Sequence, residues 1–116
     1  ETIRLSASVL YIGGNETQER YEKELIAEIN REHPNIVINL YFPGWDSWHN
    51  HLPRLKPMID RADVIVINSL VRTQLGRHLR AYCNSQHPWL PCTGRGFSSI
   101  KQSILRAAAW HKKLFI

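Results

Sequence analysis

The most constraining feature of this chain is the stretch of residues 8–15 and the helical pattern that follows it. Residues 7–12 are apolar without alternation, which is typical of a parallel strand that helices cover on both faces. Gly13 and Gly14 end this strand, and residues 16–31 then place apolar side chains at helical spacing. A buried strand that turns into a helix is the unit of an α/β fold, and such junctions are common ligand sites.

The same succession of strand and helix occurs four times in the 116 residues. Pro53 is expected in the first turn of the second helix, and Pro57 is expected to kink or break it. Proline in the last strand is confined to a sheet edge or to the first residues of the strand. Right-handed crossovers then predict a three-layer Rossmann-like or flavodoxin-like α/β sandwich whose four-stranded parallel sheet has the order 2-1-3-4. The predicted strands are residues 7–12, 36–42, 62–67 and 87–92, and the predicted helices are residues 17–31, 52–59, 71–83 and 98–111.

Length and composition predict one globular domain over residues 1–116, because 43% hydrophobic and 22% charged residues exclude a disordered chain. The start at Glu1 leaves open that the chain is a piece of a longer polypeptide with an adjoining domain. We expect neither a membrane span nor a signal peptide. Cys83 and Cys92 are expected to be free thiols in a reducing cytoplasm.

The charge of the chain favours an anionic partner. Fifteen Lys and Arg residues against ten Asp and Glu give a net charge of +5 and a pI near 9.6. This balance is typical of proteins that bind nucleotides or nucleic acid, although charge that serves only solubility stays an alternative.

The predicted ligand site lies at the carboxyl edge of the sheet, where loops rich in glycine and small polar residues can offer backbone N–H groups to a phosphate. Arg95 would neutralise the charge of the ligand, and Trp45 and Trp48 can stack on a base. The loops match neither dinucleotide-binding nor Walker patterns. The expected ligand-binding residues are Gly13, Gly14, Asn15, Thr17, Asn68, Ser69, Thr93, Gly94, Arg95, Gly96, Ser98 and Ser99.

We predict no cofactor and no catalytic residue. We also predict no metal site, because Asp46, His49 and His51 lack a distant fourth ligand. Three other functions stay open. One is an enzyme that uses His49 or Asp46, and another is a scaffold that associates with itself through its tryptophans and apolar helix faces. The third is a nucleic-acid-binding module with an exposed basic row made of Arg72, Arg77, Arg80, Arg95 and Lys101.

Four short motifs occur in an order that resembles a bacterial family, domain of unknown function 2325. They are Val9-Leu10-Tyr11-Ile12-Gly13-Gly14, Leu52-Pro53, the strand from Ala62 to Val66, and Arg95-Gly96-Phe97-Ser98-Ser99-Ile100. The chain departs from the family at Arg72-Thr73, where a Ser-His pair is expected. The resemblance implies the α/β fold and the position of the crevice, and it implies no reaction. We therefore predict a regulatory or sensor domain that binds a phosphate-bearing, nucleotide-like or other anionic ligand.

Overall fold

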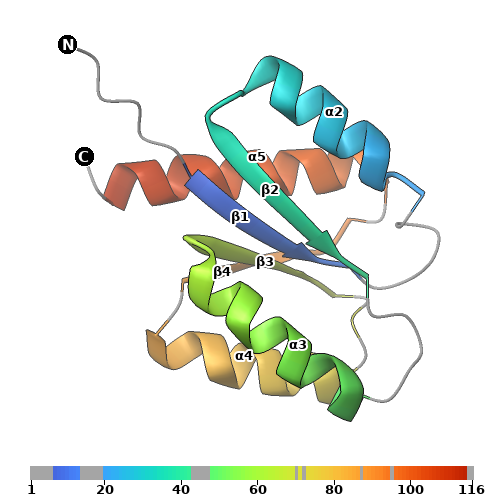
Figure 1. Ribbon diagram of the computed structural model, residues 1–116, viewed down its shortest axis with the longest axis vertical. Helices are drawn as coiled ribbons and strands as arrows, with labels where there is room; N and C mark the ends of the chain where they lie inside the picture. Colours follow the sequence, from blue (N-terminus) through green and yellow to red (C-terminus); the bar gives the residue numbers. More distant parts are fainter. Residues whose placement is uncertain are drawn as a thin grey trace.

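Four parallel strands form the centre of the molecule, as the computed structural model in Figure 1 shows. The structure describes residues 7–13, 20–42, 48–69, 71, 73–86, 88–94 and 96–114. Strands and helices alternate along the chain, and the sheet order is β2-β1-β3-β4, which confirms the predicted fold class and winding. The elements are β1 (Ala7–Ile12), α2 (Glu22–Glu32), β2 (Ile36–Tyr41), α3 (Trp48–Arg61), β3 (Val64–Asn68), α4 (Thr73–Gln86), β4 (Trp89–Cys92) and α5 (Phe97–Leu114).

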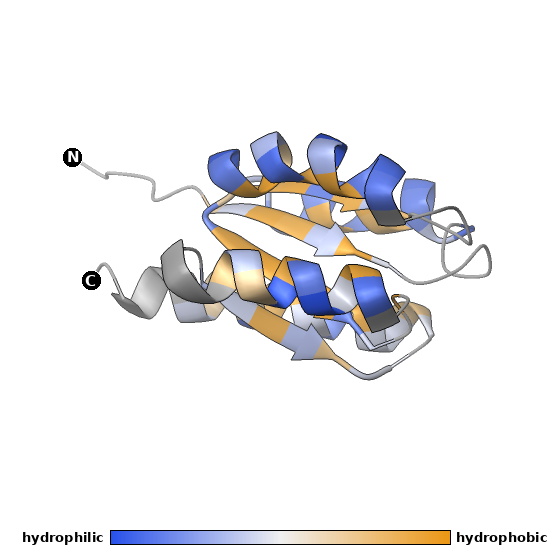
Figure 2. Ribbon diagram, turned by 90° about the horizontal axis from the view of Figure 1, so that it is seen from below, coloured by the Kyte–Doolittle hydropathy of each residue, from blue (hydrophilic) through white to orange (hydrophobic). Residues whose placement is uncertain are grey.

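Helices cover the sheet in two layers, with α2 and α5 on one face and α3 and α4 on the other (Figure 1). The alternation of strand side chains supplies both cores. In β1, Val9 and Tyr11 join the core beneath α2 and α5, whereas Leu10 and Ile12 join the core beneath α3 and α4. Figure 2 shows the matching pattern on the helices, whose hydrophobic residues are turned toward the sheet. Unbroken apolar runs are therefore explained by burial on both faces.

The two edge strands differ from the central pair. All five residues of β3 are buried, whereas β2 has one buried residue, Ile36, and its Val37 is 53% exposed. Strand β4 lies at the other edge and includes Pro91, whose missing N–H costs no ladder hydrogen bond at an edge. The prediction that proline places this strand at an edge is confirmed.

Helix α2 begins later than the pattern predicted. It starts at Glu22, and Arg20 and Tyr21 form a turn before it, so the prediction of a helix from Thr17 is wrong at positions 20 and 21. No side chain caps this helix, but Glu22 and Glu24 in its first turn interact favourably with the helix dipole. These carboxylates disfavour an anion at the same helix end.

Helix α3 also departs from expectation, because it begins at Trp48, four residues before the predicted start at residue 52. Pro53 is its sixth residue rather than part of the first turn, and Pro57 does not end the helix. Both prolines lie on the exposed side, four residues apart. The carbonyl groups that lose their intrahelical partners can be solvated there, which lowers the cost of interior proline.

Within the described residues, no helix combines the length and the apolar character that crossing a bilayer requires.

Candidate functional site

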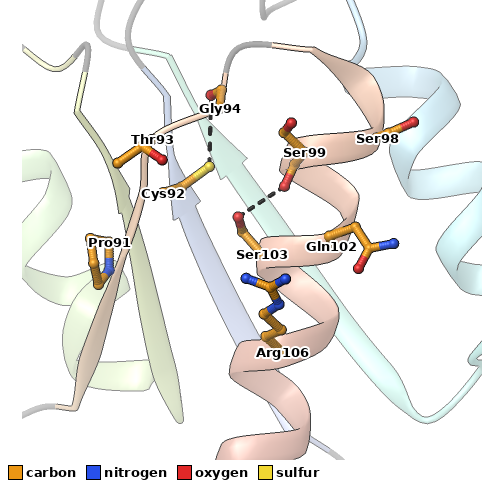
Figure 3. Close-up of a pocket in the computed structure, with 9 residues that line it drawn as sticks. All are labelled: Pro91, Cys92, Thr93, Gly94, Ser98, Ser99, Gln102, Ser103 and Arg106. Atoms are coloured by element: carbon orange, nitrogen blue, oxygen red, sulfur yellow. Dashed lines mark hydrogen bonds between the residues drawn. The ribbon is translucent and has the colours of Figure 1, made fainter.

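A hollow of about 330 Å³ lies between the carboxyl end of β4 and the first three turns of α5 (Figure 3). It holds four of the predicted ligand-binding residues, together with residues that the sequence reasoning did not select. None of the lining residues carries a carboxylate. The lining residues are Pro91, Cys92, Thr93, Gly94, Ser98, Ser99, Gln102, Ser103 and Arg106.

Gly94 fixes the shape of this hollow because it packs directly against α5. A Cβ atom at position 94 would lie 2.1 Å from the Cβ of Ser99 and 2.5 Å from its Oγ. By contrast, nothing lies within 4 Å of a Cβ built at Gly96. Only glycine therefore allows the loop after β4 to approach the first turn of α5 so closely.

The start of α5 lies one residue before the predicted helix of residues 98–111. The helix begins at Phe97, and the N–H of Ile100 donates to the carbonyl of Gly96 at 3.1 Å, which places Gly96 at the cap position. Ser98 and Ser99 are the second and third helical residues, where backbone N–H groups have no intrahelical acceptor. The Oγ of Ser103 donates to the Ser99 carbonyl at 2.9 Å.

Besides Pro91 and Cys92 of β4, the sequence reasoning missed three lining residues of α5: Gln102, Ser103 and Arg106. Helical spacing could have found them, because Gln102 and Arg106 follow Ser98 at intervals of four and Ser103 follows Ser99 at the same interval. Figure 3 shows Ser103 and the Arg106 guanidinium on the side of α5 that faces β4. Arg106 is exposed and forms no ion pair with any carboxylate in the described part of the chain.

A buried polar network supports the loop beneath the hollow. The Nδ2 atom of Asn68, whose residue is 1% exposed, donates to the Tyr11 hydroxyl at 2.9 Å and to the Gly94 carbonyl at 2.8 Å. The same atom lies 3.4 Å from the Sγ of Cys92, which in turn donates to the Gly94 carbonyl at 3.8 Å. Asn68 therefore joins β1, β3 and the loop after β4 in the interior. It was predicted to contact the ligand, but it does not line this hollow.

The Tyr11 hydroxyl of this network is uncharged at neutral pH. Burial raises the pKa of the Tyr11 hydroxyl far above its ordinary value, and the neighbouring Cys92 adds to the effect, although the hydrogen bond from Asn68 opposes it. Burial also raises the pKa of the Cys83 thiol, to about 11, which keeps this thiol protonated and unreactive. Cys83 and Cys92 are free, as predicted, and the structure shows that both are buried.

Two other predicted residues use their backbone N–H groups within the sheet. The N–H of Gly13 donates to the Tyr41 carbonyl at 2.8 Å, and that of Ser69 donates to the Cys92 carbonyl at 2.8 Å. These N–H groups extend the strand ladders and are not oriented toward a phosphate. The remaining predicted ligand residues, Gly14, Asn15, Thr17 and Arg95, lie outside the described residues, as do Trp45 and the side chain of Trp48.

The predicted basic row is divided between the two faces of the sheet. Arg77 is exposed and Arg80 is half-buried on α4, whereas Lys101 lies on α5 in the opposite layer, and Arg72 and Arg95 are outside the described residues. The Nζ atom of Lys101 forms an ion pair with Glu28 and another, at 2.9 Å, with Glu32. Lys101 therefore ties α5 to α2, and its expected place in an exposed row is corrected.

Of the histidine and carboxylate candidates, His51 has a structural partner, and Asp46 lies outside the described residues. Nδ1 of His51 lies 2.8 Å from the Tyr41 hydroxyl, and the carboxylate of Asp63 accepts from the Ser8 N–H at 2.8 Å. In the ranges that the structure describes, no three His, Cys, Asp or Glu residues are grouped closely enough to hold a metal ion.

Comparisons of the chain with protein-family models, with curated protein sequences and with solved structures found no match. The resemblance to domain of unknown function 2325 therefore stays a prediction.

Proposed function

We propose that this protein is a sensor or regulatory domain that binds a phosphate-bearing or other anionic ligand in the hollow between β4 and α5. The observation that carries the proposal is the Arg106 guanidinium, which lines a hollow otherwise made of neutral, largely hydroxyl- and amide-bearing residues. An anion there meets a positive charge and no carboxylate. The free thiols Cys83 and Cys92 fit a reducing compartment such as the cytoplasm.

The position of α5 adds to this attraction. The helix has 18 residues, and its first N–H groups, which lack intrahelical acceptors, carry the positive end of the helix dipole. Ser98, Ser99 and Ser103 add hydroxyl donors along the same wall. The volume of about 330 Å³ lies at the lower end of the range for small-molecule sites, which suits a phosphorylated metabolite or a mononucleotide.

Residues of the loops would complete the site. Arg95 stands between Gly94 and Gly96 in the sequence, so its guanidinium would act from the loop that borders the hollow. Gly14, Asn15 and Thr17 follow β1, which ends at the same edge because the strands are parallel. Trp45, after β2, would cover a base.

Calorimetric titration with inorganic phosphate, ribose 5-phosphate and ADP tests the proposal. Arg106→Met is expected to weaken binding of the tightest of these probes by roughly 10- to 100-fold, because hydrogen bonds to charged groups contribute about 1.5–3 kcal/mol. The matched control is Arg31→Met, which removes an exposed arginine from the last turn of α2 and should leave the affinity unchanged. No binding of any probe, or equal loss in both variants, would refute the site.

A further inference from the structure

Helices α3 and α4 together present an exposed basic surface, which we define as Arg54, Lys56, Arg61, Arg77 and Arg80. The two helices pack side by side over one face of the sheet (Figure 1). Four of the five side chains are exposed and Arg80 is half-buried. Asp60 is the only acidic residue in the sequence of either helix.

The arginines of the basic surface are not neutralised by carboxylates of the described residues. In the described part of the chain, none of its four arginines forms an ion pair with a carboxylate. Lys56 lies over the ring of Tyr82 at 5.4 Å, and Nε of Arg61 donates to the Pro57 carbonyl at 3.2 Å. The carboxylate of Asp60 accepts a hydrogen bond from the Tyr82 hydroxyl at 2.8 Å. The guanidinium groups therefore keep donors available for an external anion.

The rest of this surface limits the class of partner. The large hydrophobic residue found exposed in the described ranges is Val37, which belongs to β2 and not to these helices. Amphipathic membrane binding requires an apolar face that inserts, and protein interfaces rely on buried aromatic or aliphatic anchors. A surface that offers charge without such anchors fits a partner held by charge alone, and the phosphate backbone of nucleic acid is such a partner.

The spacing of the arginines suits a repeating anion. Arg54 and Arg61 are seven residues apart on α3, which is about 10 Å along a helix, and Arg77 and Arg80 share one turn of α4. Four of the five residues are arginine, whose planar fork binds phosphate in a bidentate way. We propose that the basic surface binds the sugar-phosphate backbone of nucleic acid without reading its base sequence.

Fluorescence anisotropy with the full chain tests this proposal, using labelled duplexes of two unrelated DNA sequences, an RNA duplex and a single-stranded DNA. We expect similar affinity for the two DNA sequences, and a plot of log affinity against log salt with a slope of roughly −4, because up to five phosphates would each release a counterion. The RNA duplex and the single strand determine which backbone is preferred. Anionic vesicles of phosphatidylserine and phosphatidylcholine serve as the alternative polyanion.

Paired variants locate the contact. Arg54→Gln with Arg61→Gln, and Arg77→Gln with Arg80→Gln, should each weaken duplex binding at least tenfold and lower the salt slope by roughly two. Lys23→Gln with Arg31→Gln removes the same charge from α2 on the other face and should change affinity less than twofold. Circular dichroism checks that every variant is folded.

Three results would overturn the proposal: equal losses for the α2 pair, binding that does not depend on salt, or binding to the vesicles but not to any nucleic acid. Arg106→Met should retain duplex binding, so that failure of this inference and failure of the anion site in the hollow can be told apart.

Discussion

Among the described residues, ion pairs join charges of α2 and α5, whereas the arginines of α3 and α4 form no ion pair with a carboxylate. Lys101 on α5 contacts Glu28 and Glu32 on α2, and Arg31 lies 3.9 Å from each of the same two carboxylates. On the other face, Asp60 is the single acid among the residues of two helices that carry five basic ones. One layer holds its helices together through charge, and the other directs charge toward solvent.

Both layers nevertheless bury the same kind of side chain. Ile100 and Ile104 of α5 are fully buried against one face of the sheet, and Leu55 and Leu79 of α3 and α4 are fully buried against the other. Burial of apolar area stabilises each layer without regard to the polar side of its helices. The difference in charge is therefore not required by the fold, and it is the part of the sequence that function is free to use.

The largest expected effect tests whether the apolar cores of the two layers contribute similarly to stability. Ile104→Ala in the α5 layer and Leu79→Ala in the α4 layer should each lower the free energy of unfolding by about 2–5 kcal/mol, because each leaves a cavity in a fully buried core. Urea unfolding followed by circular dichroism measures both. A cost below 1 kcal/mol in one layer alone would show that this layer is loosely packed and break the comparison.

Glycine to alanine substitutions separate the two layers further. Gly94→Ala should destabilise by about 1–3 kcal/mol, since the new methyl group overlaps Ser99 and the loop must move. A Cβ at Gly76 on α4 comes closest to the end of the Arg80 side chain, at 3.1 Å, which can shift, and it lies at an ordinary 3.7 Å from the Val71 carbonyl oxygen. For Gly76→Ala we therefore expect stabilisation of up to about 1 kcal/mol from the higher helix propensity of alanine.

Thermal unfolding measures these changes. The matched control for the loop is Gly96→Ala, because nothing lies within 4 Å of a Cβ built at this position. Equal effects of Gly94→Ala and Gly96→Ala would contradict the close packing of the loop on α5.

The smallest effect concerns the ion pairs of Lys101. Hydrogen bonding from Lys101 lowers the pKa of Glu32 from 4.5, and the hydrogen bonds to Glu28 and Glu32 raise the pKa of Lys101 above 10.5. The lowered pKa of Glu32 stabilises the fold above pH 4.5, and this stabilisation is lost as the pH falls through the pKa of Glu32 in the folded state. The raised pKa of Lys101 stabilises the fold below pH 10.5, and this stabilisation is lost as the pH rises through the pKa of Lys101 in the folded state.

Lys101→Met should therefore lower the urea midpoint at pH 7, and the difference from the parent protein should shrink at pH 3. Lys23→Met removes an exposed lysine from α2 and serves as the control. A difference that is the same at both pH values would show that the lysine stabilises through its apolar stem and not through its charge.

The fold was largely predictable because it follows from local patterns. The apolar runs of β1 and β3 indicated central strands, and Pro91 indicated an edge. Helix ends were less predictable: α2 begins at Glu22 and α3 includes both Pro53 and Pro57. Those ends depend on packing and solvation that a propensity rule does not contain.

The candidate site was predictable only in part. The sequence predicted Thr93, Gly94, Ser98 and Ser99 as ligand-binding residues, and the structure puts all four around one hollow. It could not show that Asn68 is turned inward, because that depends on contacts with Tyr11 and Gly94, which are 57 and 26 residues away. Helical spacing in the sequence places Arg106 on the same side of its helix as Ser98, but only the position of β4 makes Arg106 part of the hollow.

By itself the sequence determined the succession of elements, the parallel winding and the two buried faces, because each follows from side-chain periodicity along a continuous stretch of chain. Only the tertiary structure decided which charges are paired and which face solvent, and which N–H groups are already used. These depend on residues far apart in the sequence: Lys101 meets Glu28 across 73 positions, while the arginines of α3 and α4 meet no acid in the described chain. Electrostatic energy depends on distance in space, which periodicity along the chain does not give.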